Sequence, residues 1–165
     1  MPIKEDFLKK YFNNVFVETG SGDGSAIQIA ANAGFREIYS IELSPVWYKH
    51  CQQKFKVFGN VKLIFGDSRF ALEQVINKIH EPITFWLDAH CSGGETAGGD
   101  IIPIFDEIKI ISRHKIKTHT IAIDDMRCCN NQDEMIKELL LINSDYKIIY
   151  EDSSLFKNDI LVAKV

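Results

Sequence analysis

Short apolar runs alternate with longer amphipathic segments along most of the chain. Runs rich in β-branched and aromatic residues predict strands, and apolar residues three or four positions apart predict helices. The predicted strands lie near residues 14–19, 37–42, 61–65, 83–88 and 120–124, and the predicted helices near 24–34, 45–57, 68–79, 101–112 and 131–142. Several strands, such as ITFWL, are apolar throughout, which is typical of a parallel sheet covered on both faces.

The pattern changes after Asn143, where two strand-like runs, YKIIYE and DILVAKV, are separated only by DSSLFKN. A gap of this length is too short for a crossover helix, so the last two strands are predicted to pair as an antiparallel hairpin. Because no linker, repeat or low-complexity segment interrupts the chain, residues 1–165 are predicted to form one α/β domain.

The segment that follows the first predicted strand joins an acidic residue to three closely spaced glycines and the start of a helix. Gly20, Gly22 and Gly24 leave a turn with almost no side chain, so a nucleotide-type ligand can lie directly on the backbone at a helix N-terminus. A dinucleotide fingerprint requires glycine at its first, third and sixth positions. Counted from Gly20, the third position is Gly22, but the sixth is Ser25. The spacing therefore disfavours NAD, although an NAD-type oxidoreductase stays an alternative.

Acidic residues also lie at the carboxyl ends of the second and third predicted strands: Glu42 ends the second, and Asp67, followed by Ser68, comes just after the third. Ligands bind beyond the carboxyl ends of parallel strands, so these side chains and Glu18 are candidate ligand-binding groups. Each has a structural alternative. Glu42 can be a solvated strand end or an ordinary cap with Ser44 and Pro45 at the start of the next helix, and Asp67 or Ser68 can cap the helix that follows them.

The fourth and fifth predicted strands end in Asp88 and in the pair Asp124–Asp125. Carboxylates at adjacent strand ends form an oxygen-rich group that suits Mg²⁺ or another hard divalent cation. His90 is the best single candidate for a general base, because the unperturbed pKa of histidine lies near neutrality. Alternatively, the aspartate pair caps the next helix, or Asp124 pairs with Arg127.

The pattern Glu-x-Gly-x-Gly-x-Gly at residues 18–24 resembles motif I of the class I S-adenosylmethionine-dependent methyltransferases. The resemblance in element order extends over nearly the whole chain. It implies a Rossmann-like three-layer αβα sandwich, whose seven-stranded, mostly parallel sheet has the order 3-2-1-4-5-7-6 and ends in an antiparallel hairpin. It also implies S-adenosylmethionine as the cofactor.

The same resemblance assigns roles to the acids at the strand ends and to the glycine loop, residues 20–24. Glu18 would face the methionine ammonium group, Glu42 would bind the ribose hydroxyls, and Asp67 with Ser68 would contact the adenine. Asp88 would orient the amine of the cofactor.

The placement of Asp88 and of the pair Asp124–Asp125 further resembles the metal site of catechol O-methyltransferase and of the macrocin-type sugar O-methyltransferases. This implies methyl transfer to a hydroxyl oxygen of a small molecule or sugar, with Asp88 near the reacting atoms and His90 assisting deprotonation. A cofactor-binding but non-catalytic subunit of a larger complex is the alternative outside enzymes.

Composition narrows these interpretations. A formal net charge of −4 with scattered lysines disfavours a nucleic-acid partner. No apolar run approaches the ~18 residues of a membrane span. Cys51, Cys91, Cys128 and Cys129 lack the spacing of known metal sites, so reduced thiols in a cytoplasmic protein are expected. His114 and His119 are expected at the surface, and a homodimer is a hypothesis.

Overall fold

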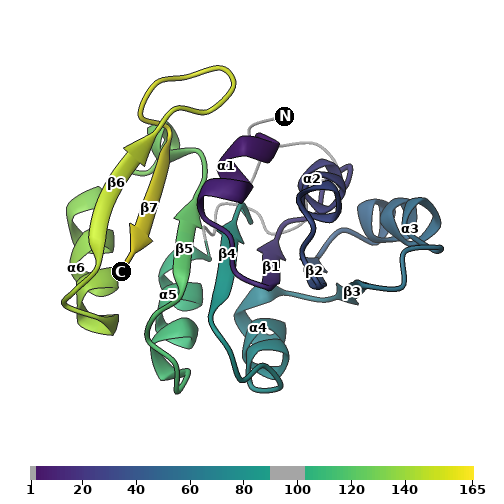
Figure 1. The fold of residues 1–165 in the computed structure, drawn as a ribbon, viewed down its shortest axis with the longest axis horizontal. Coiled ribbons are helices and arrows are strands. Elements are labelled where there is room, and N and C mark those ends of the chain that lie inside the picture. Colours follow the sequence, from purple (N-terminus) through teal and green to yellow (C-terminus); the bar gives the residue numbers. More distant parts are fainter. Residues whose placement is uncertain (1–2, 90–102) are drawn as a thin grey trace.

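The structure is a computed structural model that describes residues 3–89 and 103–165. In these ranges seven strands form one sheet in the order β3-β2-β1-β4-β5-β7-β6 (Figure 1). Strands β1 to β5 are parallel, whereas β7 runs antiparallel to both β5 and β6. The strands are β1 (Val15–Thr19), β2 (Glu37–Glu42), β3 (Val61–Phe65), β4 (Ile83–Leu87), β5 (Thr120–Ile123), β6 (Lys147–Glu151) and β7 (Ile160–Lys164). The predicted topology and terminal hairpin are confirmed.

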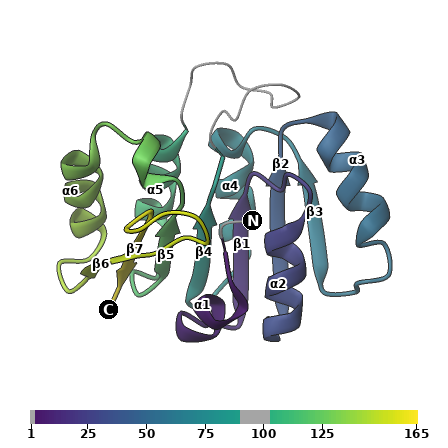
Figure 2. The same cartoon turned by 90° about the horizontal axis from the view of Figure 1, so that it is seen from above.

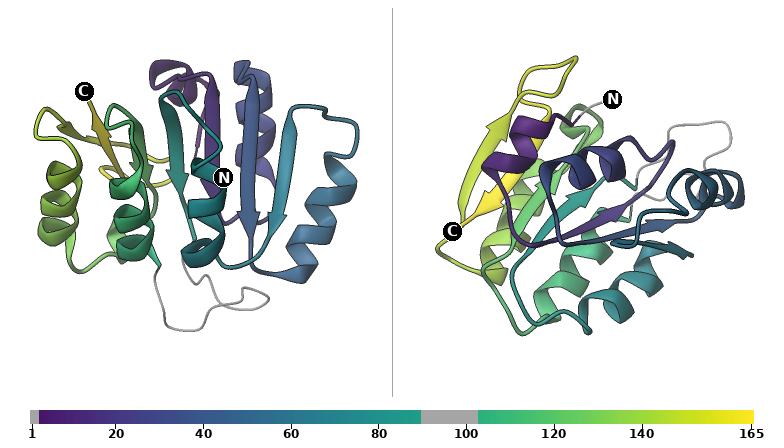
Figure 3. Two further views of the ribbon diagram at one scale, coloured as in Figure 1. Left: turned by 90° about the horizontal axis from the view of Figure 1, so that it is seen from below. Right: turned by 45° about the vertical axis from the view of Figure 1, so that its right-hand side comes forward.

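Helices cover both faces of the sheet and complete three layers. One face packs against α1 (Glu5–Lys10), α2 (Ser25–Ala33) and α3 (Pro45–Lys54), as Figure 2 shows. The other face packs against α4 (Ser68–Ile76), α5 (Ile104–Arg113) and α6 (Gln132–Ile142), which stand in front of the sheet in the left panel of Figure 3. Every residue of β1, β4 and β5 is buried, as the continuous apolar runs predict. No helix of the described ranges is long and apolar enough to cross a membrane.

Local chemistry explains where the helices next to the site begin. The Ser44 hydroxyl accepts a hydrogen bond from the Trp47 N–H at 3.4 Å, and Pro45 occupies the first position of α3. Asp67 caps α4 in the same way, so its predicted capping role is confirmed. Gly24, before α2, takes a left-handed backbone conformation that favours glycine.

Hydrogen bonds between neighbouring strand ends fix the carboxyl edge of the sheet, where the candidate residues lie. In each case the first residue after one strand donates its N–H to a backbone carbonyl near the end of the strand beside it in the sheet. The pairs are Gly66 to Glu42 (2.9 Å), Gly20 to Ile41 (2.9 Å), Asp88 to Thr19 (3.0 Å) and Asp124 to Leu87 (3.1 Å). These strand ends are therefore held side by side.

The structure corrects two expectations about element bounds. The strands β4 and β5 each end one residue earlier than predicted, so Asp88 and Asp124 lie just beyond the strands. In addition, α1 was not predicted. It has six residues, most of them charged, and only the Leu8 side chain is buried. A segment this short does not show the apolar periodicity by which a helix is recognised in a sequence.

The prediction that His114 and His119 are surface residues is wrong, because both are buried at the amino edge of the sheet. The Ile83 N–H donates to Nδ1 of His119 at 3.1 Å, so the proton of this ring is on Nε2. Nε2 lies 2.9 Å from Nδ1 of His114, whose Nε2 then donates to the Ile79 carbonyl at 3.0 Å. Two neutral rings thus form a complete hydrogen-bonded chain between backbone groups.

Candidate functional site

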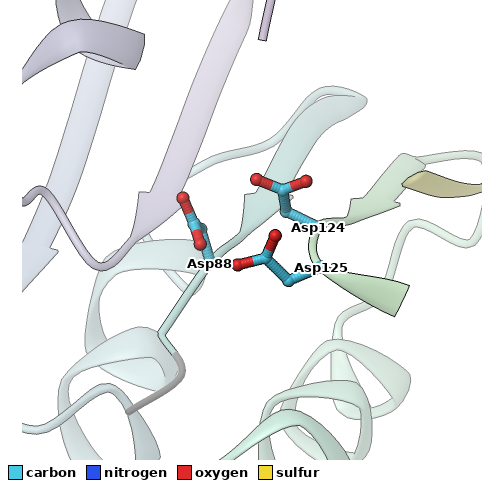
Figure 4. A group of neighbouring side chains, drawn as sticks. All are labelled: Asp88, Asp124 and Asp125. Carbon is cyan, nitrogen blue, oxygen red and sulfur yellow. The ribbon is translucent and has the colours of Figure 1, made fainter. Parts of the chain in front are cut away.

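Three carboxylates meet at the ends of β4 and β5, as Figure 4 shows. Asp88 follows β4, and Asp124 and Asp125 follow β5; one ligand oxygen from each lies within 4.8 Å of the other two. The parallel pairing of β4 with β5 brings the two strand ends together, as the sequence predicts. An oxygen-only group of this size matches the ligands that hard divalent cations prefer.

Asp124 is the most constrained member of this carboxylate cluster. Its side chain is only 4% exposed, and neither carboxylate oxygen has a hydrogen-bond partner among the described residues. Burial, together with the nearby charges of Asp88 and Asp125, raises the pKa of Asp124 to about 8. A buried carboxylate without partners is costly, and a bound cation would remove that cost.

Asp125 takes a left-handed conformation with φ 55°, and its carboxylate pairs with the Arg127 guanidinium. Arg127 also pairs with Asp159, which is 1% exposed, and stacks over the Phe156 ring at 4.3 Å. The alternative in which Arg127 pairs with Asp124 is therefore wrong. So is the capping alternative, because neither aspartate side chain caps the next helical turn, η1 (Met126–Cys128), and Asn131 precedes α6.

The glycine loop lies against the end of β4. A Cβ on Gly20 would come within 2.5 Å of the Asp88 carbonyl oxygen, so no larger residue fits there. Gly22 has φ 49°, and a Cβ on this residue would meet nothing within 4 Å. The loop therefore packs tightly at its first glycine and leaves open space beside its second.

Glu18 is buried between β2 and β4. It is the register partner of Ser40, whose hydroxyl donates to the Glu18 carboxylate at 2.5 Å, and the Ser21 hydroxyl lies 2.5 Å from the same hydroxyl. Burial raises the pKa of Glu18 well above its usual range; the Ser40 hydrogen bond opposes this, and the charges of Asp88 and Glu42 add to it. The site thus gathers carboxyl groups whose charged form a cationic group would stabilise.

Glu42 is 8% exposed and organises the two segments beside it. One carboxylate oxygen accepts from the Gly22 N–H at 3.0 Å, and the other accepts from the Ser44 N–H at 2.7 Å. The alternative of a solvated strand end is therefore wrong.

Asp67 also binds backbone, and it has a charged partner as well. Its carboxylate accepts from the Arg69 N–H at 2.9 Å and from the Arg69 guanidinium at 2.6 Å, which lowers the pKa of Asp67. Ser68, the first residue of α4, is 6% exposed.

Glu107 lies at the site but was not predicted from the sequence. It is on α5, is 1% exposed, and lines a small pocket that Asp124 also borders. Burial raises the pKa of Glu107 to about 7, although the Ser68 hydroxyl lowers it, and its Oε1 has no partner in the described part of the chain. The signal was available, because Glu107 is three residues after Ile104 and four before Ile111, on the apolar stripe of the helix.

His90, the predicted general base, lies outside the described residues, one position beyond Ala89. The other predicted site residues all lie at the carboxyl edge of the sheet, where Figure 4 shows the three aspartates.

No family model matches the chain, and no curated protein matches it. Solved structures do. An O-methyltransferase from Bacillus cereus in complex with SAH (S-adenosylhomocysteine) aligns with a TM-score of 0.69 and 13% identity, over 98% of this chain and 78% of that one. An rRNA methylase from Streptococcus thermophilus aligns with a TM-score of 0.61 and 16% identity, over 97% of this chain and 92% of that one. The precorrin-6y C5,15-methyltransferase from Geobacter metallireducens aligns with a TM-score of 0.64 and 16% identity, over 98% of this chain and 88% of that one.

Proposed function

We propose that this chain, which has the class I methyltransferase fold, transfers a methyl group from S-adenosylmethionine to a hydroxyl oxygen of a small molecule or sugar. The observation that carries the proposal is the carboxylate cluster of Asp88, Asp124 and Asp125, in which ligand oxygens lie within 4.8 Å of one another. In the proposed reaction the oxygen–methyl bond forms as the sulfur–methyl bond breaks, the hydroxyl proton leaves, and S-adenosylhomocysteine remains.

The residues around the glycine loop fit such a cofactor. When bound, S-adenosylmethionine supplies a methyl group on a positively charged sulfur. Glu18, buried with a raised pKa and with acidic neighbours, marks a place where positive charge would be stabilised. The open space beside Gly22, whose N–H is bound to Glu42, would admit part of the cofactor. We assign Gly20, Gly22 and Gly24 to the backbone cradle of the cofactor.

Four further side chains complete the proposed cofactor site. Glu42 holds the loop through the Gly22 N–H and is assigned to the ribose hydroxyls. Asp67 and Ser68, at the start of α4, are assigned to the adenine, and Asp88 to the cofactor amine. Arg69 donates four hydrogen bonds to the Asp67 carboxylate, so the assigned contact with the adenine requires the Arg69 guanidinium to release one of the two oxygens.

The carboxylate cluster fits Mg²⁺ or another hard divalent cation. Asp124 has two buried oxygens without partners in the described ranges, which is the state expected of a metal ligand. A bound cation lowers the pKa of a hydroxyl that it coordinates. The chain would supply the remaining proton transfer through His90, which is assigned as the base that accepts the hydroxyl proton.

A ribosomal RNA acceptor is the second candidate, because two structural neighbours carry the name rRNA methylase. The local charge argues for the small-molecule acceptor. Asp88, Asp124, Asp125 and Glu18 gather at one edge of the sheet, and the Arg127 charge beside them is paired with two carboxylates. A phosphate backbone would be repelled there.

Calorimetric titration of S-adenosylhomocysteine, with and without Mg²⁺, tests the cofactor. Micromolar binding is expected, and no binding to the folded protein would overturn the proposal. Release of S-adenosylhomocysteine is then measured with mixed hydroxylated acceptors and with ribosomal RNA fragments. Mg²⁺-dependent release with the former supports the proposal, release only with RNA contradicts the acceptor class, and release with neither indicates a non-catalytic subunit.

A further inference from the structure

Glu107 is a buried acid to which the proposed reaction assigns no role. It lies on α5, it is 1% exposed, and its Oε1 has no hydrogen-bond partner among the described residues. The Ser68 hydroxyl favours the charged form of this carboxyl group. A buried carboxyl oxygen without a partner is costly, so it marks a place where a ligand or a water molecule binds.

Glu107 borders a small pocket next to the carboxylate cluster. The residues that line this pocket come from α5, from the ends of β4 and β5, and from the turn that follows β5. Leu87, Ile104 and Ile123 form apolar walls, whereas Glu107 and Asp124 belong to the polar lining. None of the described residues that line the pocket is basic. The pocket thus offers carboxyl oxygens, between apolar walls, to a group that donates hydrogen bonds.

The two unpartnered acids of this pocket have different surroundings. Asp124 belongs to the carboxylate cluster, where the proposed cation binds, whereas Glu107 is outside that group of ligand atoms. With the cation in place, Glu107 remains as the acid that can bind an organic ligand. Because the pocket is small, it admits an end group of that ligand rather than the whole molecule.

We propose that Glu107 determines acceptor specificity by binding a protonated amino group of the acceptor. Because this role rests on the proposed function, it narrows the acceptor to a small hydroxylated amine. The ammonium donates a hydrogen bond to Oε1 of Glu107, and the adjacent carbon atoms lie against Leu87 and Ile123. The hydroxyl of the acceptor faces the carboxylate cluster.

An ammonium fits these surroundings better than other end groups. Its hydrogen bond to a carboxylate is stronger than that of a neutral donor, because both groups are charged. Burial raises the pKa of Glu107 to about 7, and an adjacent positive charge would lower it again. An end group that is itself a carboxylate or a phosphate would be repelled by Glu107 and Asp124.

NMR chemical-shift titration with two matched compounds, in the presence of S-adenosylhomocysteine and Mg²⁺, tests this role. The trans isomers of aminocyclohexanol and cyclohexanediol, each substituted at opposite ends of the ring, differ only in one end group. The amine is expected to bind at least ~10-fold more tightly than the diol. It is also expected to shift the backbone amide signals of Glu107 and Cys129, which border the pocket.

Glu107→Gln is expected to abolish the preference for the amine, because the amide leaves the ammonium without a counter-charge. The matched control Asp106→Asn removes a charge from an exposed position of the same helix and is expected to retain the preference. Circular dichroism checks that both variants are folded.

Equal affinities for the two compounds, or binding of neither, would show that water rather than an amine satisfies Glu107 and would overturn the proposal. Retention of the preference in Glu107→Gln, or its loss in Asp106→Asn as well, would also overturn it. Binding of S-adenosylhomocysteine is measured before either compound is added. Its absence contradicts the proposed function, whereas its presence without a preference for the amine contradicts only the role of Glu107.

Discussion

The two edges of the sheet bury ionisable side chains in opposite ways. At the amino edge, His114 and His119 satisfy each ring nitrogen through one another and through two backbone groups. At the carboxyl edge, Asp124 is equally buried but has two oxygens without hydrogen-bond partners in the described residues. A satisfied buried group stabilises the fold, whereas an unsatisfied one reduces stability and marks a place for a ligand.

Removing a ring from the amino edge should have the largest effect. His119→Ala is expected to lower the free energy of unfolding by about 3 kcal/mol, because it leaves a cavity and removes the acceptor of the Ile83 N–H. Urea unfolding at neutral pH measures this. His80→Ala, at an exposed histidine, is the control and should change little. An equally small effect at His119 would show that the histidine chain is not structural.

The same kind of change at the carboxyl edge should act on binding rather than folding. Asp124→Asn is expected to weaken Mn²⁺ binding roughly 100-fold, because it removes a charged ligand. The free energy of unfolding without metal should stay constant or rise, since the cost of burying a carboxyl group without partners is lost. Calorimetry and urea unfolding provide the two readouts, with the exposed Asp133→Asn as control. Lower stability with unchanged Mn²⁺ affinity would contradict the contrast between the edges.

Acidification should weaken the amino edge. Burial, with the charges of His114 and Lys117 adding to it, lowers the pKa of His119 to about 3, from the ordinary value of 6.5. Its stabilising contribution is therefore complete above about pH 6.5 and is lost as the pH falls toward 3, by about 1.4 kcal/mol per unit. Urea unfolding at about pH 7 and about pH 5.5 should show this loss in the wild type. A loss of the same size in His119→Gln would assign it to other groups.

Substitution of Gly22 is expected to have the smallest effect on stability and binding, and the same substitution at Gly34 is its control. Gly22 and Gly34 both have positive φ, and a Cβ on either would meet nothing within 4 Å. Each alanine substitution should cost about 1 kcal/mol of stability through backbone strain. Only Gly22→Ala, at the carboxyl edge, should also weaken S-adenosylhomocysteine binding, by about 10-fold, because its methyl group enters the proposed cofactor space. Equal calorimetric affinities of the two variants would contradict the cradle.

The sequence predicted the parts of the site that depend on chain direction. Asp88 and Asp124 come next to each other because parallel strands end at one edge, so the last residue of each predicted strand was sufficient to identify them. Glu42 was found by the same rule, although its hydrogen bonds to Gly22 and Ser44 were not. Capping at Asp67 was foreseen because it depends only on local sequence.

Contacts between distant segments were not predictable in this way. Arg127 pairs with Asp159, at the start of β7, and the two meet only because β7 pairs with β5. His114 and His119 look like exposed polar residues, but both are buried through contacts with Ile79, Ile83 and Phe85, which lie more than 30 residues away in the sequence. Glu107 was not predicted although it lies on the apolar stripe of α5, since burial of a single acid also depends on what covers that face.

The close approach of Gly20 to the Asp88 carbonyl implies thermodynamic linkage between the two proposed ligands. A Cβ at Gly20 would lie 2.5 Å from that oxygen, so the glycine loop and the end of β4 are in direct contact. We therefore expect a cation that shifts Asp88 to shift the loop as well. Linkage is reciprocal, so the factor by which the cation changes S-adenosylhomocysteine affinity must equal the factor by which S-adenosylhomocysteine changes cation affinity.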